Sequence, residues 1–210
     1  MARIDDYRQA VEIGKGDLKE KNPKRVAGMS GADFELDPEN RPVLTLNFLN
    51  RMVSVTWPEC EFSVKGPGDE VTLQEQVLLL HYLNGAMGDR IEGEWISYQE
   101  VPDGRFYLDA FVRRAKNPMV QVFGSRPEDM IRLAEELYGA SRLDHGDFSV
   151  VVRALPYVPV ALILWSGDDE FPPEGNLLFD RSISDILSAE DIAWLAGMIV
   201  YPLIGMAKKG

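Results

Sequence analysis

The spacing of apolar residues first separates helix-like from strand-like stretches. Apolar positions recur with helical spacing over residues 3–20, which predicts an amphipathic helix. Thr72 and Glu75 have the spacing of a capping box, and the helix that follows is apolar on almost every side until Gly85, a residue suited to the position just past a helix end. We therefore expect the second helix to be buried.

Three more helices are expected further along the chain. A helical stripe covers residues 106–111, directly after the turn at residues 102–104. Ser125 and Glu128 repeat the capping-box spacing and predict a helix that ends at Gly139. Ser188 and Asp191 predict the cap of a final helix, which should run to about residue 200 and be closed by Pro202.

Stretches of strand-like sequence predict two β-hairpins. Residues 43–48 and 51–57 predict one, and residues 148–154 and 158–165 predict the other. The last of these reads VPVALILW, which is apolar on both faces and typical of a central strand. Short strands are expected at 34–36, 95–99 and 177–179, and loops over the rest of 27–41 and at 65–69 and 167–175.

This order of elements predicts the α+β class, with an antiparallel or mixed sheet built from β-hairpins and helices packed on it. We expect one domain over residues 1–210. VSVTWPECEF (53–62) echoes ALILWSGDDEF (161–171), and a capped apolar helix comes after each. Either a duplicated hairpin–helix unit, at about 43–87 and 148–202, or chance explains this echo.

Charge narrows the classes of partner. The 22 basic and 34 acidic residues give a formal net charge of −12. An average surface of this sign repels polyanions, so we expect neither nucleic acid nor a membrane to be a main partner. No apolar stretch reaches the length of a membrane span, and the first twenty residues lack a signal-peptide pattern. We therefore expect a soluble cytoplasmic protein.

The metal-binding residue types are few. Cys60 is the only cysteine, so this chain alone cannot hold an iron–sulfur cluster. His81 and His145 are the only histidines, which excludes a three-histidine metal site within one chain. The sequence leaves any cofactor unknown, and Mg²⁺ or Ca²⁺ on carboxylates is the metal chemistry that it still allows.

Carboxylates cluster after the most apolar strand. Asp168, Asp169 and Glu170 lie in the loop that leaves it, and Asp180 follows the next short strand. These four are the candidate metal ligands, since hard cations bind oxygen. The alternative is a solvated acidic loop in which Asp180 caps or turns the chain.

No standard catalytic motif is present, so the sequence leaves open whether the chain is an enzyme. A nucleophile elbow and the glycine patterns of nucleotide-binding loops are absent. His81, inside the apolar helix, is the one candidate for acid–base work, and a buried histidine bonded to the backbone is the alternative. Arg105 opens a helix after a turn, where it could receive an anion.

Three stretches together resemble an uncharacterised family, domain of unknown function 3786. They are VLLLHYLNGAMG (77–88), GEWISYQEVPDGRFY (93–107) and LPYVPVALILWSGDDEFPPEGNLLFD (155–180). The resemblance implies a protein of the kind found mainly in anaerobic bacteria and archaea, and it implies no established activity. The ligand-binding candidates inside these stretches are Tyr82, Trp95, Arg105 and Tyr107.

Three functions are compatible with the sequence. The first is an accessory protein in anaerobic metabolism that binds a small ligand, a cofactor or a protein partner. The second is a divalent-metal-dependent enzyme that uses the carboxylates Asp168, Asp169, Glu170 and Asp180. The third is a docking subunit or homo-oligomer that associates through the C-terminal helix, whose apolar residues fall on more than one face.

Overall fold

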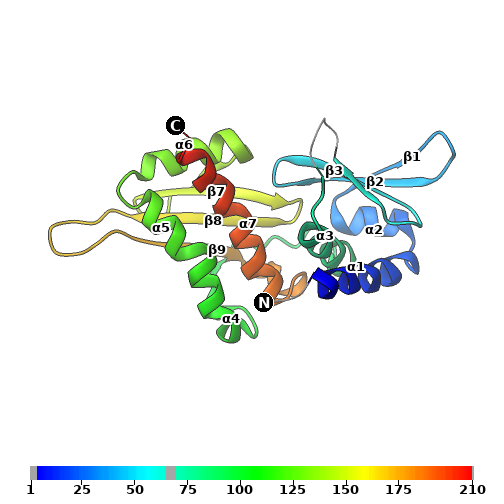
Figure 1. Ribbon diagram of the computed structural model, residues 1–210, viewed down its shortest axis with the longest axis horizontal. Helices are drawn as coiled ribbons and strands as arrows, with labels where there is room; N and C mark the ends of the chain where they lie inside the picture. Colours follow the sequence, from blue (N-terminus) through cyan, green and yellow to red (C-terminus); the bar gives the residue numbers. More distant parts are fainter. Residues whose placement is uncertain (1–3, 65–69, 210) are drawn as a thin grey trace. The chain divides into compact units, whose positions relative to one another are not determined.

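Two antiparallel sheets with helices packed on them form the computed structural model, which describes residues 4–64 and 70–209 (Figure 1). The predicted α+β class is confirmed, and both sheets are built from hairpins as expected. The loop predicted at residues 65–69 lies outside the described residues.

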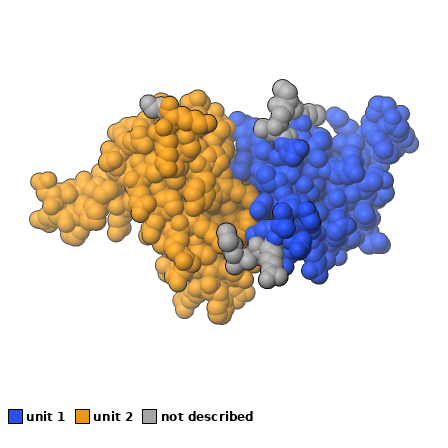
Figure 2. Space-filling view, in the orientation of Figure 1, with its two compact units in different colours: residues 1–90, 155–157, 185–187 blue, residues 91–154, 158–184, 188–210 orange. Residues whose placement is uncertain are grey.

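The contacts divide the chain into two compact units (Figure 2). Unit 1 consists of residues 1–90 together with two short later segments, Leu155–Tyr157 and Asp185–Leu187. Unit 2 consists of residues 91–154, 158–184 and 188–210. The proposed internal repeat, about 43–87 and 148–202, stays a prediction.

Unit 1 has a four-stranded sheet in the order β1-β2-β3-β4, with three helices. Leu44 and Leu46 of β2 lie opposite Val55 and Val53 of β3, and all four side chains are buried. The elements are α1 (Ile4–Lys19), α2 (Pro23–Ser30), β1 (Asp33–Leu36), β2 (Pro42–Phe48), β3 (Arg51–Thr56), β4 (Phe62–Val64) and α3 (Leu73–Gly85).

Helix α3 begins as its sequence predicts. Thr72 Oγ1 accepts a hydrogen bond from the Glu75 N–H at 3.3 Å, and the Glu75 carboxylate accepts one from the Thr72 N–H at 2.8 Å. Glu75 also forms an ion pair with Arg51 of β3. Gly85 is the last residue of the helix rather than the residue after it, and it is needed there because a Cβ would collide with the Ile186 carbonyl.

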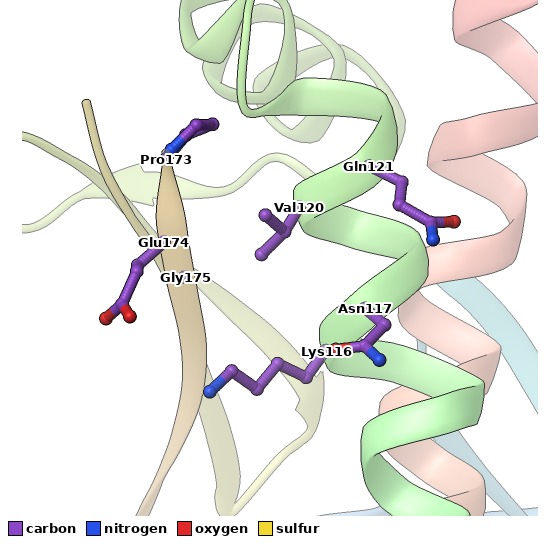
Figure 3. Close-up of a pocket in the computed structure, with 7 residues that line it drawn as sticks. All are labelled: Lys116, Asn117, Val120, Gln121, Pro173, Glu174 and Gly175. Atoms are coloured by element: carbon purple, nitrogen blue, oxygen red, sulfur yellow. The ribbon is translucent and has the colours of Figure 1, made fainter. Parts of the chain in front are cut away.

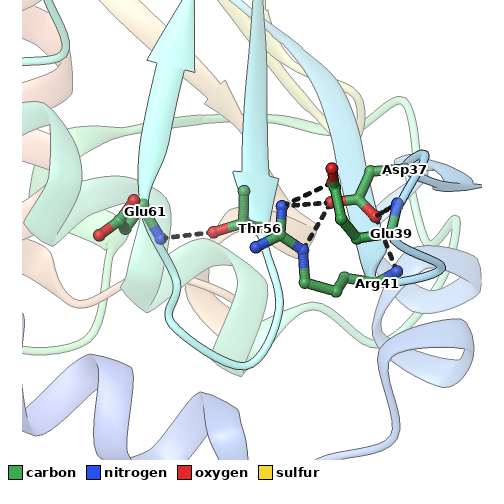
Figure 4. A network of polar contacts seen from close by, with 5 residues as sticks. All are labelled: Asp37, Glu39, Arg41, Thr56 and Glu61. Atoms are coloured by element: carbon green, nitrogen blue, oxygen red, sulfur yellow. Dashed lines mark hydrogen bonds and ion pairs between the residues drawn. The ribbon is translucent and has the colours of Figure 1, made fainter.

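Helix α2 occupies residues that the sequence indicated to be partly loop. Asn22 is its N-cap, accepting a hydrogen bond from the Arg25 N–H at 3.2 Å, and Pro23 opens its first turn. Between β1 and β2 the chain turns through a small polar network: Asp37 Oδ1 accepts from the Arg41 N–H at 2.8 Å, and Arg41 Nε donates to Asp37 Oδ2 at 2.7 Å (Figure 4).

Tyr82 ties the distant segments of unit 1 together. Its side chain is fully buried on α3, and its hydroxyl donates to the Ser30 carbonyl at 2.7 Å. The same oxygen accepts from the Tyr157 N–H at 3.3 Å. Gly31, with a φ of 68°, lets the chain pass close by, since a Cβ there would meet Pro156 at 2.8 Å.

Unit 2 has a five-stranded sheet in the order β5-β9-β8-β7-β6. Helices α4, α5 and α7 lie over one face of this sheet (Figure 1), where β8 contributes Val160, Leu162 and Leu164 to the core. The elements are β5 (Trp95–Ser97), η1 (Tyr98–Glu100), α4 (Gly104–Phe111), η2 (Val112–Lys116), α5 (Asn117–Phe123), α6 (Pro127–Tyr138), β6 (Ser141–Arg142), β7 (Phe148–Leu155), β8 (Val158–Trp165), β9 (Glu174–Asp180), η3 (Arg181–Asp185) and α7 (Ala189–Ala207).

The prediction that Pro202 ends the last helix is wrong, because α7 continues to Ala207. Proline has no N–H to give to the carbonyl four residues earlier, which here is that of Met198. The Tyr138 hydroxyl reaches this part of α7 instead, donating to the Ile199 carbonyl at 2.8 Å and lying 3.5 Å from that of Met198. A side-chain hydroxyl therefore lies beside the carbonyl that Pro202 leaves without a backbone donor, in a helix that continues past the proline.

Helix α7 is also the one helix in the described part of the chain that is long and apolar enough to cross a membrane by length and composition. The most apolar window of α7 is 56% buried inside the structure, as expected for a core helix. Its N-terminal capping box is confirmed, since the Ser188 N–H donates to Asp191 at 3.2 Å and the Asp191 N–H to Ser188 Oγ at 3.2 Å.

Replacing Tyr82 with Phe should destabilise the protein by about 1–3 kcal/mol, because it leaves a buried carbonyl and a partly buried N–H without their partner. Urea unfolding followed by circular dichroism measures the change. Tyr201→Phe is the matched control, because the Tyr201 side chain is 54% exposed. Equal stability of the two variants would contradict the role given to the Tyr82 hydroxyl.

Candidate functional site

The acidic loop predicted as a metal site is used locally. Asp168 Oδ1 accepts hydrogen bonds from the Glu170 N–H at 2.8 Å and the Phe171 N–H at 2.7 Å. These two bonds lower the pKa of the Asp168 carboxyl, and the bond from Phe171 has the larger effect. Asp168 therefore shapes the turn at the tip of its own loop, which extends beyond the helices of unit 2 (Figure 1).

Asp180, the fourth predicted metal ligand, is almost fully buried at the end of β9. Its Oδ2 accepts from the Gly93 N–H at 2.7 Å, and its Oδ1 accepts from the Ser182 hydroxyl at 2.6 Å and from the N–H groups of Glu92 and Ser182 at 3.1 Å each. Burial alone would raise the pKa of this carboxyl, but the four hydrogen bonds outweigh it, and the pKa is lowered. Asp180 thus joins the segment before β5 to the end of β9.

Over residues 4–64 and 70–209, no three His, Cys, Asp or Glu side chains form a group that could hold a metal ion. The set Asp168, Asp169, Glu170 and Asp180 is therefore not brought together as a ligand shell. His81, the acid–base candidate, lies half-buried on α3 in unit 1, whereas the four carboxylates belong to unit 2.

The four ligand-binding candidates are also divided. Tyr82 is buried in unit 1, where its hydroxyl makes the two hydrogen bonds described above. Trp95 is half-buried on β5, directly opposite Asp180 in the register of the sheet. Arg105 and Tyr107 are exposed in the first turn of α4. The structure places the last three in unit 2 and Tyr82 in the other unit.

A groove of about 330 Å³ lies elsewhere in unit 2, between helix α5, with the residue just before it, and the start of β9. Figure 3 shows Lys116 and Val120 extending from the helix toward β9, and Glu174 turned away from the helix. The residues that line the groove are Lys116, Asn117, Val120, Gln121, Pro173, Glu174 and Gly175.

Two glycines bring the walls of this groove close together. A Cβ on Gly175 would lie 2.9 Å from Val120 Cγ2, and a Cβ on Gly124 would lie 2.8 Å from Cγ of Pro173. A Cβ at either position would crowd the contact between α5 and the start of β9. The helix wall and the strand wall are thus held in contact at one end, and the groove opens beside that contact.

The helix wall carries a local irregularity. Elements α4, η2 and α5 follow one another without a break from Gly104 to Phe123, and η2 is a π-helical turn in which the Asn117 N–H donates to the Val112 carbonyl. Pro118 explains the wider turn, because it can give no hydrogen bond to the Arg114 carbonyl four residues before it. Lys116 projects from this turn. Single π-helical turns occur frequently at functional sites.

Comparison with protein families gives one match. Residues 22–201 match the family described as "Domain of unknown function (DUF3786)". Because the match covers most of the chain, the chain belongs to this family, as its motifs indicated. No curated protein sequence and no solved structure matches the chain.

The groove was missed by the sequence prediction. Pro173 and Gly175 fall in the loop expected at 167–175, and no sequence pattern singles out Lys116. One signal was available, Pro118, because a proline inside a helix changes the helix geometry locally. The approach of β9 to that point depends on the sheet and has no local signature.

Replacing Asp180 with Asn should destabilise the protein by about 1–3 kcal/mol at neutral pH, because the amide NH₂ would meet backbone N–H donors. Asp169→Asn is the matched control in the exposed loop, and it should leave stability unchanged. Thermal and urea unfolding measure both variants.

The effect should depend on pH in a defined direction. The folded pKa of Asp180 lies below its unfolded value, so its contribution is complete above about pH 4 and is lost as the pH falls through the folded pKa. The stability difference between the wild type and Asp180→Asn should therefore shrink below about pH 4. A difference that stays constant down to pH 2 would contradict the charged role of Asp180.

Proposed function

We propose that this protein is a non-catalytic accessory protein that binds a small polar molecule in the groove between α5 and β9. The observation that carries the proposal is a groove of about 330 Å³ with an uncommitted lysine beside a π-helical turn. This volume is at the small end of the range of ligand sites in proteins.

The polar side chains of the groove support binding rather than internal structure. Four polar side chains of the groove form no hydrogen bond or ion pair with another protein group in the described part of the chain. They belong to Lys116, Asn117, Gln121 and Glu174. Val120 and Pro173 add apolar surface to the same walls. A few polar groups against apolar walls are the usual composition of a small-molecule site.

A catalytic role has less support from the same walls. The lining contains neither a cysteine, serine or histidine nor a pair of carboxylates, so the nucleophile–histidine and paired-carboxylate arrangements of common hydrolases are absent from it. The second function considered, a divalent-metal enzyme, has no described group of ligands to rest on. A role in anaerobic metabolism follows from the family resemblance alone.

The test is a screen of small polar molecules by nuclear magnetic resonance, read from the backbone amides of residues 173–175. Val120→Phe places an aromatic ring in the groove and should weaken every hit by about tenfold or more, equal to a loss of about 1.4 kcal/mol. Val122→Phe is the matched control, since Val122 is half-buried on the same helix and does not line the groove.

Hits that bind both variants equally would place the binding site elsewhere and overturn the proposal. Absence of any hit that perturbs residues 173–175 would also overturn it. Unfolding curves for both variants check that a loss of binding does not come from a loss of folding.

A further inference from the structure

The strand wall of the groove presents a backbone donor to it. In an antiparallel pair, the N–H and C=O groups of successive residues face alternate sides. The Asp147 N–H donates to the Leu164 carbonyl at 3.2 Å. The backbone N–H and C=O of Leu164 therefore point toward the β7 side of the sheet and away from β9. Its partner in the register is Gly175, which accordingly turns its own N–H and C=O away from β8.

The other side of β9 gives the same alternation. The Arg181 N–H donates to the Glu94 carbonyl at 2.9 Å. The backbone N–H and C=O groups of residues 181, 179, 177 and 175 therefore point toward the β5 side. Strand β5 pairs only with residues 178–180 and does not reach Gly175. The Leu177 N–H, which faces this side too, is satisfied by Asn176 Oδ1 at 3.0 Å.

Gly175 therefore stands out on this edge. Neither β8 nor β5 pairs with this side of Gly175, although the residue is buried. Buried backbone donors are almost always paired with protein, water or a ligand. Gly175 and Lys116 both line the groove. The Gly175 N–H, which the alternation turns away from β8, and the Lys116 ammonium are thus two donors for one acceptor there.

The charge around the two donors favours an anion. The Glu174 carboxylate extends from β9 away from the helix (Figure 3). The acidic tip of the β8–β9 loop, at residues 168–170, extends beyond the helices (Figure 1), where water and salt screen its charge. Lys116 is the basic residue among those that line the groove, and Val120 with Pro173 supplies apolar contact for a short carbon skeleton.

We propose that the ligand is a small organic carboxylate, whose oxygens accept a hydrogen bond from the Gly175 N–H and pair with the Lys116 ammonium. This inference rests on the proposed binding function and adds the chemical class of the ligand. A charged acceptor bonded to an N–H and an ammonium is stronger than a neutral one, so the carboxylate should be preferred over an uncharged group of the same shape.

The experiment compares pairs of molecules that share one carbon skeleton, a short-chain carboxylic acid and its primary amide. Each is titrated into the whole protein labelled with ¹⁵N, and the amide signals of Gly175 and Asn176 are followed. The acids should shift the Gly175 signal in a saturable way and bind at least about tenfold more tightly than their amides. Asn176 is the internal control, because its N–H faces β8.

Lys116→Gln should reduce acid binding by about tenfold and leave amide binding unchanged. Lys208→Gln is the matched control, which removes the same charge at an exposed position after α7 and should change neither. Inorganic phosphate, titrated in the same way, should bind more weakly than the acids.

The outcomes separate the two proposals. If amides or phosphate bind as tightly as the acids, or if Lys116→Gln has no effect, the carboxylate inference is wrong, and a Val120-dependent site still supports the binding function. If no molecule of either kind perturbs Gly175 and no other polar molecule binds in the groove, both proposals are wrong. Tighter acid binding that requires Lys116 supports both.

Discussion

Pro118 has no N–H, and the helical side of unit 2 is shaped by that missing donor. A regular α-helix would need this N–H to bond the Arg114 carbonyl, so the chain widens into the π-helical turn η2 before α5 begins. The wider turn carries Lys116 on the side that faces β9 (Figure 3). Pro202 poses the same problem in α7, where the Tyr138 hydroxyl lies 3.5 Å from the Met198 carbonyl that has lost its donor. The backbone widens at Pro118, whereas a side-chain hydroxyl lies at the carbonyl affected by Pro202.

The sequence predicted the features that depend on neighbours along the chain. The capping boxes at Thr72 and Ser188 and both hairpins need only residues a few positions apart, and they are present. The predicted box at Ser125 is not, because Arg126 is the N-cap of α6 and no side chain caps it. The continuation of α7 past Pro202 was unpredictable for a different reason: its compensating donor, Tyr138, is more than sixty residues away.

The candidate site illustrates the same limit. Asp168 and Asp180 are of a residue type that binds cations, but the type of a residue does not reveal which groups surround it. In the structure both carboxylates accept backbone N–H groups, Asp168 within its own turn and Asp180 from a segment 87 residues earlier in the chain. The groove, by contrast, depends on which edge of β9 each residue faces, and this follows from the strand order β5-β9-β8, which no local pattern encodes.

The composition of unit 1 has a consequence for the order in which the protein forms. Two pieces of this unit, Leu155–Tyr157 and Asp185–Leu187, come from the second half of the chain. A ribosome that has released only the first ninety residues has released the sheet and helices of unit 1 without the segment that gives the Tyr82 hydroxyl its second partner. Domains generally fold from the N-terminus as synthesis proceeds, and contacts between distant residues are slow to form. Unit 1 is therefore synthesised first but completed only after most of unit 2 has been made.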